Sequence, residues 1–142
     1  MKKAFSLFMF VSSIVTLLCG CTNSDHDLGI EKTQKVEVSS AENPNSILKI
    51  FNEQDEVTEF VNRMKVDQWK ISDVSPNLDA NKVYKLYQAD TITLGESNNR
   101  ERKLNQTAEI VTYKKSPYIT FRTNHLSFDF KIPKDVEEYL SN

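Results

Sequence analysis

The chain has 142 residues, of which 39% are hydrophobic and 10% are aromatic. This composition and length suit one small packed domain and leave no room for a second. The 20 acidic residues outnumber the 18 basic ones, for a formal charge of −2 at pH 7, so a nucleic-acid partner, which needs a basic surface, is disfavoured. With three glycines in all, the chain cannot form the glycine-rich loops that hold phosphates and dinucleotides.

The first twenty residues contain the three parts of a secretory signal peptide in their usual order. Lys2 and Lys3 precede the apolar run Ala4–Leu18, and a small residue and cysteines follow. A membrane-spanning helix needs about 20 apolar residues, whereas this run has fifteen and includes four hydroxyl side chains. We therefore interpret residues 1–20 as a cleaved signal peptide.

Two cysteines, Cys19 and Cys21, lie where a bacterial lipoprotein would be cut. The segment Leu18-Cys19-Gly20 before Cys21 resembles a lipobox, in which Leu stands three residues before the acylated cysteine and a small residue directly before it. Cys19 would instead follow the bulky Leu18. The sequence thus predicts a diacylglyceryl anchor on Cys21, which would hold the protein at the extracytoplasmic face of the cell membrane. The lysine- and asparagine-rich composition is typical of low-GC Gram-positive bacteria.

Residues 21–45 are predicted to be a flexible tether. They are mostly polar, and a segment with few large apolar side chains cannot bury enough surface to offset its ordering entropy. Val36 and Val38 alternate with charged residues and would suit a short strand, although no neighbouring pattern supports one. With Cys19 removed and Cys21 acylated, the chain keeps no thiol for a disulfide, a redox couple or a zinc site.

Residues 46–142 are predicted to form one α+β domain. A β-branched run, Ser46–Phe51, indicates a strand. After a polar cluster, Val57, Phe60, Val61 and Met64 recur at the spacing of an amphipathic helix. The remaining pattern predicts short strands, a hairpin and a terminal helix: Val83–Gln88, Thr91–Leu94, Glu109–Lys114, Tyr118–Ile132 and Pro133–Leu140. We expect an antiparallel sheet of about five strands with both helices packed on one face.

The hairpin has a register that its pattern specifies. A two-residue turn at Asn124-His125 suits the tolerance of Asn for positive φ. The register that follows pairs Thr123 with Leu126, Phe121 with Phe128, and Ile119 with Phe130. It collects the apolar side chains on one face, and a one-residue slip would destroy that separation.

The lipobox, the strand Ile47–Asn52 that runs into an acidic helix, and the tyrosine-rich later strands resemble the small YhfM-like lipoproteins of Bacillus and its relatives. The resemblance extends over about residues 1–140, and the segment Gly95–Gln106 has no clear counterpart. No activity is established for that family. The resemblance therefore implies an envelope lipoprotein and supplies no catalytic or ligand-binding residues.

Catalytic patterns are weak in this chain. Ser46 and Lys49 have the spacing of a serine–lysine pair, but on a strand they would point to opposite faces. The two histidines, His26 and His125, are far apart in the sequence. Carboxylate pairs are plentiful, and they matter only where a cleft holds both and shifts a pKa. The segment Arg100–Lys103 is basic, which could favour anionic headgroups or could simply be a solvated loop.

The aromatic residues leave two readings open. Four tyrosines and the tryptophan could line a ligand surface, or they could cover a sheet with their polar atoms reaching water. They are Tyr84, Tyr87, Tyr113, Tyr118 and Trp69.

These observations favour a lipid-anchored, non-catalytic binding or accessory module at the cell envelope. We expect no enzymatic activity, no metal and no cofactor, and a protein or envelope partner that the sequence does not identify. Two alternatives stay open. One is an immunity or inhibitor lipoprotein that blocks a toxin or a phage at the membrane. The other is an envelope hydrolase whose two carboxylates converge in a cleft.

Overall fold

A computed structural model of the chain describes residues 28–75, 77–90 and 103–142. The predicted signal peptide, Cys21 and the predicted strand Thr91–Leu94 lie outside these residues. Within them, no helix has both the length and the apolar character to cross a membrane.

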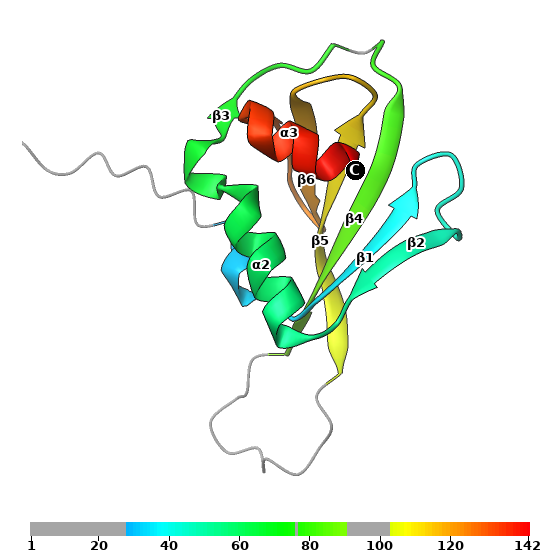
Figure 1. The fold of residues 1–142 in the computed structure, drawn as a ribbon, viewed down its shortest axis with the longest axis vertical. Coiled ribbons are helices and arrows are strands. Elements are labelled where there is room, and N and C mark those ends of the chain that lie inside the picture. Colours follow the sequence, from blue (N-terminus) through cyan, green and yellow to red (C-terminus); the bar gives the residue numbers. More distant parts are fainter. Residues whose placement is uncertain (1–27, 76, 91–102) are drawn as a thin grey trace, which may run out of the picture.

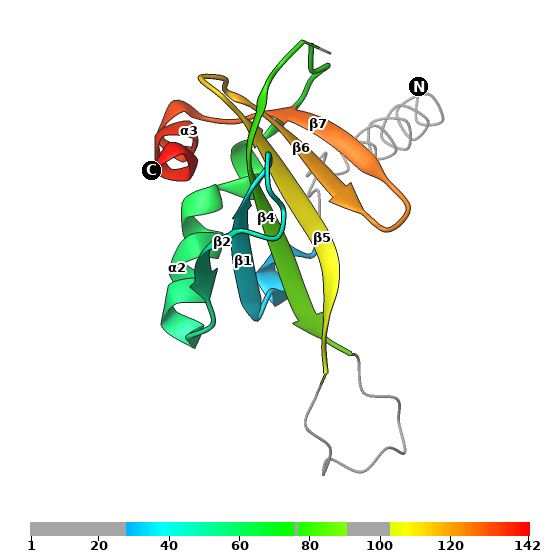
Figure 2. The same ribbon diagram turned by 90° about the vertical axis from the view of Figure 1, so that its right-hand side faces the viewer.

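The described chain folds as an antiparallel sheet with two α-helices on one side (Figures 1 and 2). In sequence the strands are β1 (Lys35–Ser40), β2 (Ile47–Phe51), β3 (Lys70–Ile71), β4 (Ala80–Ala89), β5 (Leu104–Tyr113), β6 (Tyr118–Thr123) and β7 (Ser127–Lys131). In space their order is β2-β1-β4-β5-β6-β7-β3. The helices are α2 (Gln54–Met64) and α3 (Lys134–Ser141), and two short 3-10 helices are η1 (Ile30–Lys32) and η2 (Val66–Gln68). The α+β prediction is confirmed, with seven strands in place of about five.

The largest correction concerns the predicted tether. Within residues 21–45, the described part from Leu28 onward is folded: Lys35–Ser40 is strand β1, which pairs with β2 on one side and β4 on the other. Val36 and Val38 point into the core, with exposed fractions of 0% and 5%. The tether prediction is therefore wrong for residues 28–45, because two valines are enough when β2 and the distant strand β4 flank them.

Helix α2 forms where the apolar periodicity predicts it. Val57, Phe60 and Met64 are buried against the sheet, and the acidic first turn complements the positive end of the helix dipole. The helix ends at Lys65, whose φ of 46° is left-handed. The Trp69 Nε1 then donates to the Met64 carbonyl oxygen at 2.7 Å, which satisfies one of the last free carbonyls of the helix.

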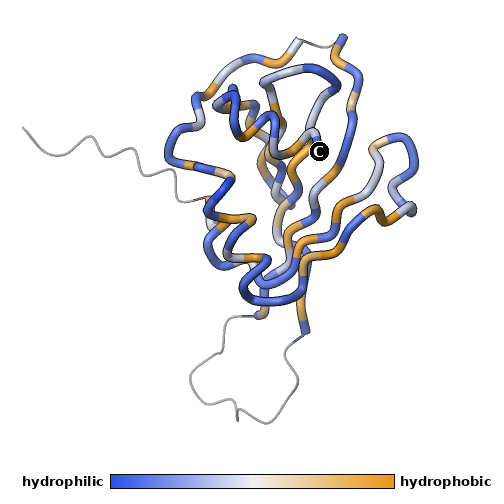
Figure 3. The backbone as a smooth tube through the Cα atoms, viewed as in Figure 1, coloured by the Kyte–Doolittle hydropathy of each residue, from blue (hydrophilic) through white to orange (hydrophobic). Residues whose placement is uncertain are grey.

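The predicted hairpin register is confirmed. Ile119 faces Phe130 and Phe121 faces Phe128 across β6 and β7, and the Thr123 N–H donates to the Leu126 carbonyl oxygen at 2.8 Å. The terminal helix follows as predicted and buries Val136 and Leu140. Figure 3 shows hydrophobic and hydrophilic residues alternating along the strands, as expected for a sheet with one face packed against the core.

Candidate functional site

The side of the sheet away from the helices carries most of the organised polar chemistry of the described residues. We call this surface the polar face. It is formed by β1, β4, β5, β6 and β7, and its side chains alternate along each strand with those that enter the core. Its principal members are Lys35, Glu37, Lys85, Tyr87, Glu109, Tyr113, Tyr118, Thr120, Arg122, Asp129 and Lys131.

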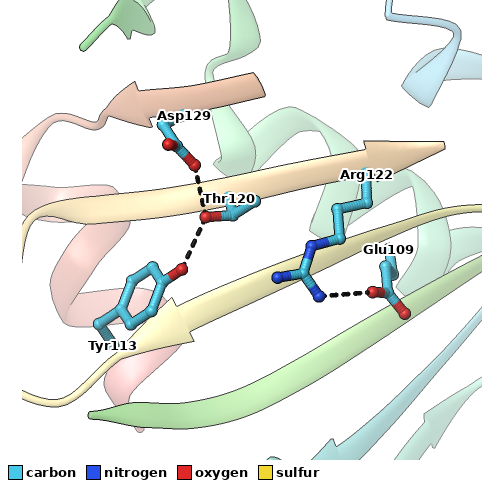
Figure 4. Close-up of polar contacts among 5 residues, drawn as sticks. All are labelled: Glu109, Tyr113, Thr120, Arg122 and Asp129. Atoms are coloured by element: carbon cyan, nitrogen blue, oxygen red, sulfur yellow. Dashed lines mark hydrogen bonds and ion pairs between the residues drawn. The ribbon is translucent and has the colours of Figure 1, made fainter. Parts of the chain in front are cut away.

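One row of charges crosses four neighbouring strands of the polar face. The register places the row in the order Glu37, Lys85, Glu109, Arg122. Opposite charges that face one another across strands stabilise a sheet. At one end of the row the Arg122 Nη1 lies 3.2 Å from the Glu109 Oε1 (Figure 4).

The other end of the row is tied into a second contact group. Glu37 accepts hydrogen bonds from the Lys35 Nζ at 2.7 Å and from the Tyr87 hydroxyl at 2.7 Å. These bonds, with Lys35 the larger cause, hold the pKa of the Glu37 carboxyl below its usual value. Burial, followed by the bond to Glu37, raises the pKa of Tyr87 to about 12. At neutral pH the pair is therefore a carboxylate and a neutral phenol donor.

A chain of three hydroxyl and carboxyl groups connects β5, β6 and β7 (Figure 4). The Thr120 Oγ1 lies 2.6 Å from the Asp129 Oδ1 and 2.7 Å from the Tyr113 hydroxyl oxygen. The Thr120 hydroxyl donates its single proton to Asp129. Tyr113 must then donate to Thr120.

Three carboxylates of the polar face accept hydrogen bonds or ion pairs from neighbouring side chains. A general acid needs a carboxyl whose pKa is raised, whereas the shifted carboxyl of this face, Glu37, has a lowered pKa. Glu109 and Asp129 lie on β5 and β7 with β6 between them, so their strands are roughly 9–10 Å apart. Each of these two carboxylates already has a donor, Arg122 or Thr120.

The aromatic residues singled out from the sequence divide between the two sides of the sheet. Tyr87, Tyr113 and Tyr118 lie on the polar face. Tyr84 is buried, its hydroxyl donates to the Leu140 carbonyl oxygen at 2.8 Å, and burial raises its pKa. Trp69 is buried as well and packs on Phe130 with ring centroids 5.4 Å apart. The last two are structural residues and line no ligand surface.

The remaining sequence candidates are not brought together. Ser46 precedes β2, while Lys49 lies on that strand with its Nζ 4.3 Å from the centre of the Phe51 ring. His125 is exposed at the hairpin turn. Over residues 28–75, 77–90 and 103–142, no group of three or more His, Cys, Asp or Glu side chains could hold a metal ion.

A small depression lies between α3 and the ends of β4 and β5. Its lining includes Asn81, Thr112, Ser116, Glu137 and Ser141. Its volume is about 10 Å³, about the space of one water molecule. It is too small for a substrate.

Sequence reasoning missed Glu109, Thr120, Arg122 and Asp129 as members of one surface. The available signal was the hairpin register, since pairing the apolar residues on one face leaves Thr120, Arg122 and Asp129 together on the other. Comparison with known proteins finds no matching protein family, no matching curated sequence and no matching solved structure. The resemblance to the YhfM-like lipoproteins stays a prediction.

Proposed function

We propose that this protein is a lipid-anchored, non-catalytic binding module at the extracytoplasmic face of a bacterial cell membrane, and that the polar face is the surface that binds an envelope partner. The observation that carries the binding half is the set of fixed polar contacts on that face, in which tyrosines, cations and carboxylates are held in place before any partner arrives. Preorganised groups of this kind bind with a smaller loss of conformational entropy.

The sequence supports the anchoring half of the proposal. Residues 1–20 have the order of a signal peptide, and Leu18-Cys19-Gly20-Cys21 fits a lipobox. Two acyl chains on one cysteine give stable membrane attachment. Because the folded part already includes Leu28, only residues 22–27 would separate the anchor from the domain.

Processing in cells tests the anchor. We expect the protein in the membrane fraction, with a mass that corresponds to cleavage before Cys21 plus a diacylglyceryl group, and globomycin should block this cleavage. Cys21→Ser should abolish acylation, whereas the matched variant Cys19→Ser should be processed normally. An unmodified Cys21 in the native protein would contradict the proposal.

Crosslinking in native membranes tests the binding surface. The variant Arg122→Ala removes the cation that pairs with Glu109 on the polar face. Arg63→Ala is its control, since Arg63 has a similar exposure and pairs with Glu59 on α2, on the helical side of the domain. We expect the crosslinked product of the native protein to persist in the Arg63 variant and to be lost in the Arg122 variant. Products that are identical in all three proteins would exclude the polar face as the binding surface.

A further inference from the structure

The β6–β7 hairpin carries an apolar stripe that runs out of the core toward its turn. Phe130, Phe128 and Leu126 alternate along one side of the strand. Their exposed fractions rise from 2% to 38% to 57%. Phe130 packs on Trp69, whereas Figure 2 shows the hairpin turn lying away from α2 and α3.

The hairpin turn lies at the same end of the sheet as the beginning of the folded chain. Thr123, the last residue of β6, is in register with Ala108 of β5, and Ala108 faces Leu86 of β4. Just beyond Leu86, the Gln88 Nε2 donates to the Gly29 carbonyl oxygen at 2.7 Å. The chain therefore enters the domain at the end where the hairpin turns.

Chain length limits how far this end can be from the membrane. An extended chain spans at most about 3.6 Å per residue, so the seven steps from Cys21 to Leu28 cover at most about 25 Å. If Cys21 is acylated, the hairpin end of the sheet is the part of the domain that this short connection draws toward the bilayer.

The other exposed apolar cluster is on the opposite edge of the sheet. It consists of Ile47, Leu48 and Ile50 on β2. Ile47 is in register with Ser39, near the end of β1 that is distant from Lys35 and from Gly29. The exposed fractions of this cluster are similar to those of Leu126 and Phe128, but it lies farther from the start of the folded chain. It therefore serves as a matched control surface.

Several backbone groups of the turn already have partners within it. The Thr123 N–H donates to the Leu126 carbonyl oxygen, and the Thr123 Oγ1 accepts from the N–H groups of His125 and Leu126 at 3.4 and 3.2 Å. Backbone groups without partners are what make non-helical chain costly in lipid. The N–H groups of Thr123, His125 and Leu126 therefore keep their partners when the turn approaches the acyl region.

We propose that the hairpin tip, through Leu126 and Phe128, inserts into the interfacial layer of the same bilayer that holds the acylated Cys21, and so sets the orientation of the domain. The inference rests on the proposed lipid anchor. Lipid supplies the attachment, while the hairpin fixes which surfaces face the membrane and which remain open to a partner. Aromatic and aliphatic side chains are favoured in the interfacial layer of a bilayer.

Thiol labelling of the full, acylated protein in native membranes tests this inference, because the acylated chain has no other free thiol. We compare His125→Cys at the turn with Leu48→Cys on β2, using a membrane-impermeant maleimide. The turn cysteine should react several-fold more slowly than the β2 cysteine in membranes, and the two rates should converge once mild detergent removes the bilayer. Equal rates in membranes would overturn the inference, as would protection of the turn that persists in detergent, which would indicate a protein partner or a second copy.

A second measurement keeps the apolar contribution separate from the anchor. The mature chain with Cys21→Ser is mixed with vesicles of phosphatidylglycerol and phosphatidylethanolamine. Leu126→Ser combined with Phe128→Ser should weaken partitioning at least about tenfold, since each buried side chain of this size contributes a factor of that order. Ile47→Ser combined with Leu48→Ser should leave partitioning unchanged, and an equal loss in both pairs would overturn the inference. Failure of the anchor itself appears elsewhere, as a soluble protein with unmodified Cys21.

Discussion

A single hydroxyl group, that of Thr120, connects three strands on the polar face. It donates to Asp129 and accepts from Tyr113, and the Thr120 side chain is almost fully buried between them. A buried polar group without a partner costs more than the bond it has lost. The stability of the sheet at this point therefore depends on the complete chain of three groups.

Thr120→Val tests this dependence. The substitution keeps the shape and removes the hydroxyl, so Tyr113 and Asp129 both lose their partner, and we expect a loss of about 1–2 kcal/mol in the free energy of unfolding. Thr120→Ser, which keeps the hydroxyl, should lose clearly less. Urea unfolding followed by the fluorescence of Trp69, the only tryptophan, measures both. A valine variant as stable as the native protein would show that the contact contributes nothing.

The Glu37 carboxyl predicts an acid-sensitive contribution to stability. Its pKa in the folded protein lies below the ordinary value of 4.5, chiefly because Lys35 donates to it. A carboxyl with a depressed folded-state pKa stabilises the fold above the unfolded pKa, and this stabilisation is lost as the pH falls through the folded pKa. We expect Glu37→Gln to reduce the loss of stability between neutral pH and pH values below 4.5. Chemical unfolding at several pH values measures the free energy of unfolding of both proteins. Curves that run parallel for the native protein and the variant would contradict this prediction.

At the scale of elements, β1 decides where the domain begins. It is an interior strand, paired with both β2 and β4. Ile30 of η1, just before it, is 1% exposed and belongs to the same core cluster. Without β1, the strand β2 would lose the one strand that pairs with it among the described residues.

Truncation separates the predicted boundary from the observed one. A chain that starts at Leu28 should fold cooperatively, whereas a chain that starts at Ser46, the boundary predicted from the sequence, should not. The reason is that the second chain lacks Ile30, Val36 and Val38, which are all buried. Circular dichroism and the thermal transition measure the outcome. Cooperative unfolding of the chain from Ser46 would show that β1 is dispensable.

The contrast between β1 and the hairpin explains which elements were predictable. The β6–β7 pair is local, so the alternation of Phe128 and Phe130 with polar residues fixed its register within fifteen residues of sequence. The partners of β1 are β2, which is close in sequence, and β4, which follows more than forty residues later. The alternation of Val36 and Val38 alone could not predict pairing with a strand as distant as β4.

The polar face could not be predicted from the sequence for the same reason, because its residues come from strands that are distant in the sequence. Its charge row joins Glu37, Glu109 and Arg122, which lie far apart in the sequence and meet only through the strand order. Tyr84 and Tyr87 differ by three positions on one strand, yet one is a core residue and the other lies on the polar face. The composition gives the number of tyrosines but does not show on which side of the sheet each one lies.

At the scale of the whole molecule, the sheet formed by the described residues is open, with β2 and β3 at its two edges. Open edges invite pairing with other chains, and proteins blunt them with bulges, charges or very short strands. The β3 edge has only two residues. The β2 edge has an irregular register beside Ser39 and a lysine, Lys49, between exposed Leu48 and Ile50.

Lys49 is therefore expected to keep the molecule from associating through β2. Lys49→Val would make Ile47–Phe51 a continuous β-branched and apolar segment on an open edge, which is the sequence signature of edge-to-edge aggregation. We expect concentration-dependent self-association of the mature Cys21→Ser chain, measured by light scattering and size-exclusion chromatography. Lys134→Val is the control, because it adds the same side chain on the exposed surface of α3, where no strand edge is available. Association of both variants to the same extent would show that surface hydrophobicity alone drives it, and a monomeric Lys49 variant would leave the bulge and the strand's short length as sufficient protection of that edge.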